Sequence, residues 1–151
     1  MAIKEFKDEY RFLSNFWPCQ IEYEGIQYAC TETAYQASKS LFFNIKTEIS
    51  KMKPGAAKRY ARTVALRPDW EQVKLKVMED VVRLKFNSSQ NLKELLLITG
   101  DQELIEGNTW NDTFWGVCRG KGENHLGKIL MKVRTELQID DVFDCLKHNG
   151  A

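Results

Sequence analysis

The sequence predicts an α+β fold that is predominantly helical, forming one compact domain over residues 1–151 with a small β element. Apolar residues recur at helical spacing through most of the chain, whereas strand-like alternation is confined to the first thirty residues. Hydrophobic residues make up 43% of the sequence and charged residues 28%, which is typical of a chain that buries a core. A length of 151 residues corresponds to one domain.

The β element and the first helix come early in the chain. Residues 20–23 and 26–28 flank Gly25 and predict a hairpin. We expect the first helix to run from Thr31, as its N-cap, to near Asn44. Small and apolar side chains recur at i, i+3, i+4 and i+7 on one of its faces, namely Ala34, Ala37, Ser38 and Leu41.

Four further helices are predicted from their boundary residues. Pro54 favours the first turn of a short helix that runs to about Thr63. Asp69 and Gln72 form a capping-box pattern before a long helix that ends near Phe86. A helix over residues 91–98 stops at Gly100, and the last helix begins at Asn124, its expected N-cap. We expect the apolar residues of this last helix to face inward, namely Leu126, Ile129, Leu130, Val133 and Leu137.

Charge and residue content narrow the possible functions. The net charge of +1 excludes a global basic field, so any binding of a polyanion must be local. The four cysteines include no C-x-x-C pair and therefore indicate neither a zinc ribbon nor a redox dithiol. There are only two histidines, so acid–base chemistry would fall to carboxylates. The sequence has no signal-peptide pattern or membrane-length apolar run, and we expect a cytoplasmic protein without a membrane partner.

A glycine-rich turn before the last helix is typical of an anion-binding site. Its glycines would permit positive φ and close approach of a ligand, its cations would add charge, and the helix start would offer free N–H groups. The residues concerned are Gly116, Arg119, Gly120, Lys121, Gly122 and Asn124. The alternative is an ordinary loop that leads into a helix.

A polar ridge on the first helix is the second candidate. Glu32, Gln36 and Lys39 recur at i, i+4 and i+7, with Tyr35 beside them. This spacing places a carboxylate, an amide and an ammonium on one face. The alternative is a solvent-exposed face with a surface salt bridge.

Asp112 is the third candidate, because aromatic residues flank it just before the glycine turn. Burial beside Trp115 would raise the pKa of its carboxyl group and suit it to general acid catalysis. In a turn, the same carboxylate could instead accept hydrogen bonds from backbone amides.

A basic segment, residues 51–67, contains six cations and no acid. Such a local excess could steer phosphates and favours nucleic acid as a partner. The alternative is a solvated basic face that the acidic residues of 140–144 offset.

Motifs spread over nearly the whole chain resemble the NADAR (YbiA-like) family. The motif before the last helix is the most specific, since tryptophan-glycine, a glycine turn and Asn-x-Leu-Gly follow one another in the family's order. The matching segments are residues 12–16, 32–39, 85–86, 104–106, Asp112, 115–116 and 124–134. One departure is Thr33, where many members have histidine after the helix glutamate.

The resemblance implies a mostly helical α+β fold and N-glycosidase activity that needs neither a metal nor another cofactor. One branch of the family removes ADP-ribose from guanine bases of nucleic acid and so counters DNA ADP-ribosyltransferase toxins. A second branch cleaves riboflavin-pathway intermediates that carry a ribose phosphate on an amino-pyrimidine. We expect the first activity, in a monomer that acts on ADP-ribosylated DNA or RNA as an antitoxin. A non-catalytic ADP-ribose- or NAD-binding module is the alternative from another class.

The resemblance and the chemistry together suggest roles for individual residues. Glu32 would stabilise the oxocarbenium-like sugar and activate water, Lys39 and Gln36 would orient the water or the ribose, and Asp112 would hold ribose or protonate the base. The diphosphate would lie on the glycine turn near Arg11. The expected catalytic residues are Glu32, Lys39 and Asp112, and the expected substrate-binding residues are Arg11, Ser14, Asn15, Phe16, Tyr35, Gln36, Trp115, Gly116, Arg119, Gly122 and Asn124.

Overall fold

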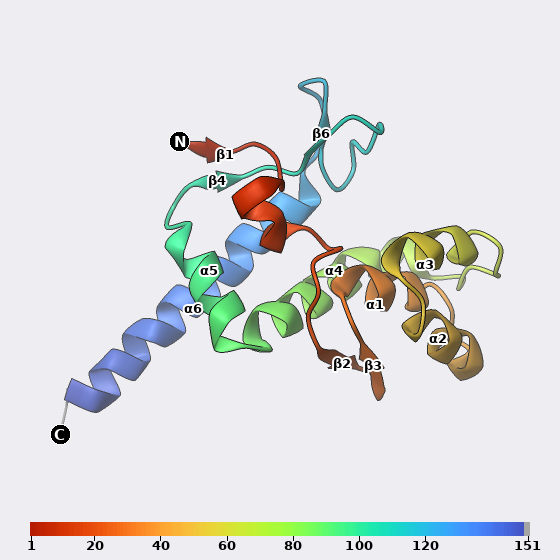
Figure 1. Ribbon diagram of the computed structural model, residues 1–151, viewed down its shortest axis with the longest axis horizontal. Helices are drawn as coiled ribbons and strands as arrows, with labels where there is room; N and C mark the ends of the chain where they lie inside the picture. The colour runs from red at the N-terminus through yellow and green to blue at the C-terminus, as the bar shows by residue number, and fades with distance from the viewer. Residues whose placement is uncertain (150–151) are drawn as a thin grey trace. The chain divides into compact units, whose positions relative to one another are not determined.

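The computed structural model describes residues 1–149, and its contacts divide the chain into two compact units. The central unit is Ser14–Ser89, and the terminal unit combines Met1–Leu13 with the chain from Gln90 onward. Helices dominate both units and the strands form only two-stranded pairs, which confirms the predicted α+β class (Figure 1). The single-domain organisation stays a prediction. No described helix is both long and apolar enough to span a membrane.

The central unit opens with the predicted hairpin. Strand β2 (Ile21–Tyr23) pairs antiparallel with β3 (Ile26–Tyr28), and Ile21 lies opposite Tyr28. Glu24 and Gly25 connect the strands at φ of 50° and 83°, as the tight turns that match strand twist require. Four helices follow: α1 (Thr31–Ala37), α2 (Phe43–Ser50), α3 (Pro54–Ala61) and α4 (Trp70–Asn87).

Helix α1 is the buried centre of this unit. All seven of its residues are buried, and it packs against α2, α3 and α4. Ala34, Ala37 and, on α3, Ala57 have no exposed surface, so the helices can approach closely at these small side chains. The polar residues of α1 are therefore held in a packed interior.

The boundaries of α1 differ from the expectation. Cys30 is the N-cap, while the Thr31 hydroxyl donates to the Asn15 carbonyl instead of capping the helix. The helix ends at Ala37 and does not continue to Asn44. Beyond it, the Lys39 carbonyl accepts the Arg67 N–H at 2.8 Å, so the connection to α4 takes over a backbone group that a longer helix would use.

The expected helix over residues 54–63 and the long helix to Phe86 are both present, as α3 and α4. Pro54 occupies the first turn of α3, as predicted. The capping box at Asp69 is wrong in its side-chain part. Asp69 precedes α4, but its carboxylate binds the Arg67 guanidinium at 2.7 Å and caps no helix amide.

Lys85 of α4 is the most fully buried cation of the described chain. Its Nζ donates to the Ser14 carbonyl at 2.8 Å. Burial lowers the pKa of this lysine to about 7, and the nearby thiols of Cys19 and Cys30 only partly oppose the shift. An amine in this position is held close to the balance between its charged and neutral forms.

In the terminal unit, α6 (His125–Asn149) packs against α5 (Gln90–Ile98) and β4 (Glu103–Leu104). Strand β1 (Ala2–Ile3) pairs in parallel with β4, and β5 (Gly107–Asn108) pairs in parallel with β6 (Val117–Cys118). A 3-10 helix, η1 (Asp8–Leu13), packs on α5. The predicted inward face of the last helix is confirmed, because its apolar members Leu126, Ile129, Leu130, Val133 and Leu137 are all buried.

The four cysteines are free thiols with different exposure. Cys30 and Cys118 are buried, Cys19 is half-buried and Cys145 is exposed. Burial raises the pKa of the Cys19 thiol to about 11.

The buried lysine predicts an unusual pH dependence of stability. Between the folded pKa of about 7 and the unfolded value of 10.5, the unfolded chain binds one more proton at this site, so its contribution to the free energy of unfolding rises with pH. We expect the free energy of unfolding of Lys85→Met, relative to that of the wild type, to be highest at pH 6. By pH 10 the wild type should gain a few kcal/mol of unfolding free energy relative to the variant. Denaturant unfolding of both proteins at several pH values checks this, and a pH-independent difference would contradict it.

Candidate active site

The predicted ridge on α1 is a buried polar group in the central unit. Glu32 and Gln36 are 8% and 3% exposed, and Gln36 Nε2 donates to Glu32 Oε1 at 2.8 Å. This geometry excludes the alternative of a solvent-exposed face with a surface salt bridge. Because a buried carboxylate and amide are costly unless they serve structure or function, the Glu32 group, meaning Glu32, Gln36 and Lys39, is the strongest candidate for chemistry.

The segment 14–16 fixes the start of this group. The Glu32 N–H donates to the Asn15 carbonyl at 3.1 Å, and the Thr31 hydroxyl donates to Asn15 Oδ1 at 2.9 Å. Ser14 is anchored in turn by Lys85, and its Oγ accepts the Phe16 N–H. Ser14 and Asn15 therefore lie against the backbone of Glu32 and fix the start of the helix that carries its carboxylate.

One acceptor in the Glu32 group has no hydrogen bond within the described chain. It is Oε1 of Gln36, which is fully shielded from solvent. Buried acceptors are almost always satisfied, so an unsatisfied one in a polar group is a place where a ligand or a water would bind. A sugar hydroxyl would satisfy it.

Lys39 follows α1 and lies in the electrostatic field of Glu32. Burial is the main cause that lowers the pKa of Lys39, while the Glu32 carboxylate raises it. Lys58 of α3, Arg62 directly after α3 and Lys74 of α4 add to the lowering, so these cations lie close enough to repel it. Of these four cations, only Lys39 was among the site residues expected from the sequence. Lys58 and Arg62 belong to the predicted basic segment, and Lys74 lies outside it.

The aromatic residues of the central unit divide into two kinds. Tyr35 is buried against Trp70, with ring centroids 5.2 Å apart, and Lys39 Nζ lies 5.5 Å from the Tyr35 centroid. Tyr35 thus positions Lys39, and its direct contact with substrate stays a prediction. Phe16 is 47% exposed and remains available for stacking on a ring.

Thr33, at the position where histidine was expected from the resemblance, faces the interior. Its Oγ1 donates to the Cys30 carbonyl at 3.0 Å and lies 3.6 Å from Cys30 Sγ. Both side chains are buried. Thr33 closes the first turn of α1 and offers no titrating group.

The glycine turn lies in the terminal unit and is built around two close backbone approaches. Gly122 has φ of 153°, and a Cβ there would collide with the Gly116 carbonyl. A Cβ on Gly116 would collide with the Glu106 carbonyl. All three glycines of the turn were expected to adopt positive φ, but among them only Gly120 and Gly122 do. Gly116 is therefore required by packing alone.

The amides at the start of α6 are already occupied. His125 N–H donates to the Phe114 carbonyl at 3.1 Å, and Leu126 N–H donates to the Trp115 carbonyl at 3.0 Å. The expectation of free N–H groups at this helix start is therefore wrong for both residues. The carbonyls of the preceding aromatic segment take the place that a phosphate would need.

Asn124 directly precedes α6, as expected of an N-cap, and its carbonyl accepts the Lys128 N–H at 3.0 Å, but its side chain binds elsewhere. Its Nδ2 donates to the Leu104 carbonyl at 2.9 Å, and its Oδ1 accepts the Glu106 N–H at 3.0 Å. The side chain thus joins the helix start to the end of β4. Glu106, which we did not select from the sequence, places its carboxylate beside Gly116, and its signal was the short motif at residues 104–106.

Of the two roles predicted for Asp112, general acid and turn former, the structure shows the second. Its Oδ1 accepts the N–H groups of Phe114 and Trp115 at 3.2 and 2.9 Å. The Asn108 side chain binds the Asp112 backbone from the other side. Asp112 shapes the aromatic segment, in which Phe114 packs edge-on to Trp115 with centroids 4.8 Å apart.

The two arginines expected to bind phosphate are both exposed, on η1 and in the turn. Arg119 Nη1 donates to Asn111 Oδ1 at 3.0 Å, which holds it across the turn, while Arg11 lies in the last turn of η1. No cluster of three His, Cys, Asp or Glu side chains suited to a metal ion occurs within residues 1–149. The independence from metal stays a prediction.

Comparisons with known proteins identify the family. The NADAR domain family matches residues 3–138. N-glycosidase YbiA of Escherichia coli is 38% identical over 137 residues, covering 88% of this chain and 85% of that protein. N-glycosidase Npun_R5314 of Nostoc punctiforme is 37% identical over 136 residues, covering 85% of this chain and 86% of that protein. The riboflavin biosynthesis protein VVA0006 of Vibrio vulnificus is 38% identical, over 87% of this chain and 36% of its own length.

The fold agrees with these matches. The NMR structure of Escherichia coli YbiA superimposes with a TM-score of 0.82 at 35% identity, covering 94% of this chain and 86% of that one. The chain therefore belongs to the NADAR domain family, and its relatives include proteins named as N-glycosidases.

The close approaches in the glycine turn predict a sharp intolerance to added atoms. We expect Gly116→Ala and Gly122→Ala each to destabilise the protein by about 2–4 kcal/mol, because a methyl group would displace a backbone carbonyl. Gly55→Ala in α3 is the control, since its Cβ would meet only an ordinary contact. Thermal unfolding measures the three changes, and an equal effect at all three positions would contradict the prediction.

Proposed function

We propose that this protein is an N-glycosidase that hydrolyses the bond between ADP-ribose and guanine bases of nucleic acid. The buried Glu32 carboxylate, oriented by Gln36 within a family that includes N-glycosidases, is the observation that carries the proposal. Hydrolysis of an N-glycosidic bond develops positive charge at the anomeric carbon, and a fixed carboxylate stabilises that charge.

The chemistry requires one water and one proton transfer at each end of the bond. Glu32 accepts a proton from the water while the water oxygen bonds to the anomeric carbon. The carbon–nitrogen bond breaks, its electron pair stays on the base nitrogen, and that nitrogen takes up a proton. Lys39, close to Glu32, favours the ionised carboxylate that this step needs.

Gln36 suits the sugar side of the reaction. One end of its amide holds Glu32 at 2.8 Å, and the other end is the buried acceptor without a partner in the described chain. A ribose hydroxyl donating to that acceptor would align the sugar with the carboxylate. Asp112, Arg11 and the glycine turn belong to the terminal unit, and their roles with base and diphosphate stay predictions.

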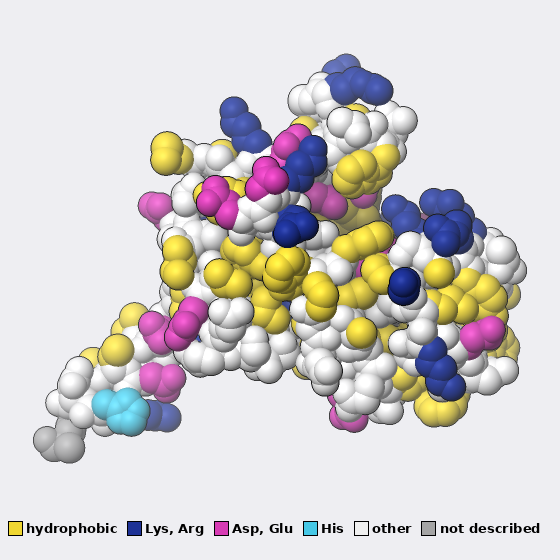
Figure 2. Space-filling view, in the orientation of Figure 1, with side chains coloured by type: hydrophobic (Ala, Val, Ile, Leu, Met, Phe, Trp, Pro, Cys, Tyr) yellow, Lys and Arg dark blue, Asp and Glu magenta, His cyan; other side chains and the backbone are white. Residues whose placement is uncertain are grey.

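The cations around Lys39 support a nucleic-acid substrate. Lys58, Arg62 and Lys74 lower its pKa by repulsion, so they form a local positive field in a chain whose net charge is only +1. Figure 2 shows Lys and Arg side chains gathered near α3. Phosphates of a nucleic-acid strand would relieve this repulsion. A protein with this activity would reverse the action of a DNA ADP-ribosyltransferase toxin.

A second candidate substrate is a riboflavin-pathway intermediate with a ribose phosphate on an amino-pyrimidine. The observation that favours it is the 38% identity to the riboflavin biosynthesis protein of Vibrio vulnificus, of which this chain covers 36%. The Glu32 group would serve the same bond cleavage there. The nucleic-acid substrate would need several phosphate contacts, whereas the riboflavin-pathway intermediate would need only one.

The role of Glu32 is tested by Glu32→Gln with DNA that carries ADP-ribose on guanine. We expect release of ADP-ribose to fall about 1,000-fold while binding of the substrate is retained, because the amide keeps the shape but cannot accept the proton. Glu22→Gln is the matched control, since Glu22 accepts a hydrogen bond from Gln27 in the same unit but is exposed. No turnover by the wild type, with ADP-ribose bound, would favour a binding module instead.

The cation field is tested by Lys58→Ala and Arg62→Ala. We expect each to lower kcat/KM on ADP-ribosylated DNA about tenfold and to weaken its salt dependence, with a smaller loss on an ADP-ribosylated guanosine that has no strand to contact. Arg59→Ala is the control, because Arg59 follows Lys58 on α3 but is not among the cations acting on Lys39. Equal losses on both substrates would contradict a contact with the nucleic-acid strand.

A further inference from the structure

The C-terminal part of α6 carries an apolar stripe that no described element covers. Ile139, Val142, Phe143 and Leu146 follow the i, i+3, i+4 and i+7 pattern of one helix face. They are 51%, 60%, 59% and 62% exposed, in contrast to the buried apolar residues of the first half of the helix. Figure 2 shows hydrophobic side chains along one side of this segment and acidic ones along another.

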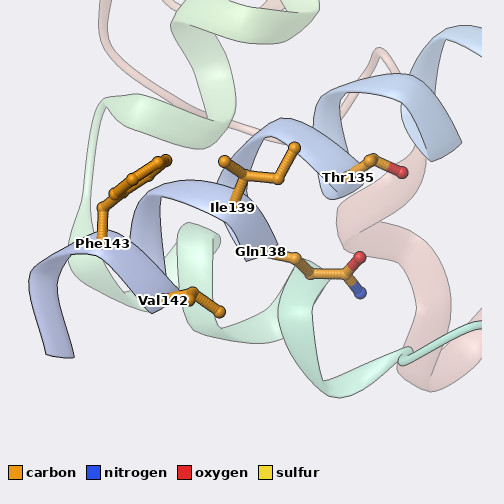
Figure 3. A pocket seen from close by; sticks show the side chains of 5 residues that line it. All are labelled: Thr135, Gln138, Ile139, Val142 and Phe143. Carbon is orange, nitrogen blue, oxygen red and sulfur yellow. The ribbon is translucent and has the colours of Figure 1, made fainter. Parts of the chain in front are cut away.

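A hollow accompanies the stripe. It has a volume of about 370 Å³ and is lined by Thr135, Gln138, Ile139, Val142 and Phe143 (Figure 3). A hollow between side chains of one helix is the kind of surface that receives a side chain from a second helix. An apolar face of this kind, exposed at the end of a long helix, marks an interaction site.

The stripe begins where the family resemblance stops. The NADAR domain match ends at residue 138, and the first exposed apolar residue of the stripe is Ile139. The enzymatic unit shared with the family therefore does not explain these apolar side chains. Their function is separate from the proposed catalysis.

The charges beside the stripe are self-complementary. Asp140 and Lys147 are seven residues apart, so they lie on the same flank of the helix. Both are exposed, and neither forms an ion pair within the described residues. On an antiparallel copy of this helix, the acidic end of one flank would lie opposite the basic end of the other.

We propose that this face binds a second copy of the chain, with the two α6 helices antiparallel around a two-fold axis near Val142 and Phe143. In this register Ile139 lies opposite Leu146 of the second copy, and Val142 lies opposite its Phe143. The hollow receives the Leu146 side chain, and Asp140 and Lys147 pair twice across the axis. This state differs from the monomer expected from the sequence.

The size of the contact sets its strength. The stripe spans eight residues, or about 11 Å of helix, so the buried area is small compared with a standard interface. We expect a reversible dimer with a dissociation constant on the order of 10 μM. Sedimentation velocity over a range of concentrations measures it, and a monomer at all concentrations would overturn the proposal in favour of another partner or none.

A charge exchange tests the pairing without relying on apolar truncation. Asp140→Lys and Lys147→Asp should each weaken association about tenfold, because each single change places like charges opposite one another. The double variant restores opposite charges across the axis and should recover the wild-type dissociation constant. Unfolding midpoints equal to that of the wild type exclude folding defects, and a double variant as weak as the singles would overturn the proposal.

Cysteine cross-linking tests the antiparallel register, in a Cys145→Ser background that removes the exposed thiol. Val142→Cys lies near the axis and should form a disulfide with its own counterpart under mild oxidation. Leu146→Cys should not, because its two copies would lie about 10 Å apart along the helices, beyond disulfide reach. Equal cross-linking at both positions would overturn the antiparallel arrangement.

Discussion

The central unit depends on how the backbone of Ser14 and Asn15 is held. The buried Lys85 ammonium binds the Ser14 carbonyl, and the next carbonyl, that of Asn15, accepts the Glu32 N–H and the Thr31 hydroxyl. These contacts connect the long helix α4 to the first turn of α1. The backbone of Glu32 therefore depends on a lysine far from it in sequence, while Gln36 on the same helix holds its carboxylate.

The same arrangement explains why polar groups are tolerated inside this unit. Burying Glu32, Gln36 and Lys85 opposes folding unless each finds a partner. Each finds a partner in α1 or in the segment before it, and small residues such as Ala34 let the other helices close around them. The remaining acceptor on Gln36 is consistent with a site that is completed only when substrate binds.

The sequence predicted the helices well because their apolar periodicity and terminal residues act locally. Pro54, Gly100 and the inward face of the last helix are examples. The predicted helix boundaries were wrong where other partners compete for the boundary residues. The Lys39 carbonyl accepts the Arg67 N–H, the Asp69 carboxylate pairs with the Arg67 guanidinium, and the Asn124 side chain binds backbone groups near β4. The paired strands β1–β4 and β5–β6 have two residues each, too few for alternation to reveal. The Glu32 ridge was predicted by spacing, but its burial depends on packing that spacing does not contain.

The unequal exposure of the four thiols has a practical consequence for chemical labelling. Only the thiolate reacts readily with maleimides, and a pKa of about 11 leaves Cys19 almost entirely protonated at neutral pH. Cys30 and Cys118 are shielded by the fold, while Cys145 is open to solvent. A single fluorophore could thus be attached to the native chain at Cys145, beside the apolar stripe of α6, without replacing any residue.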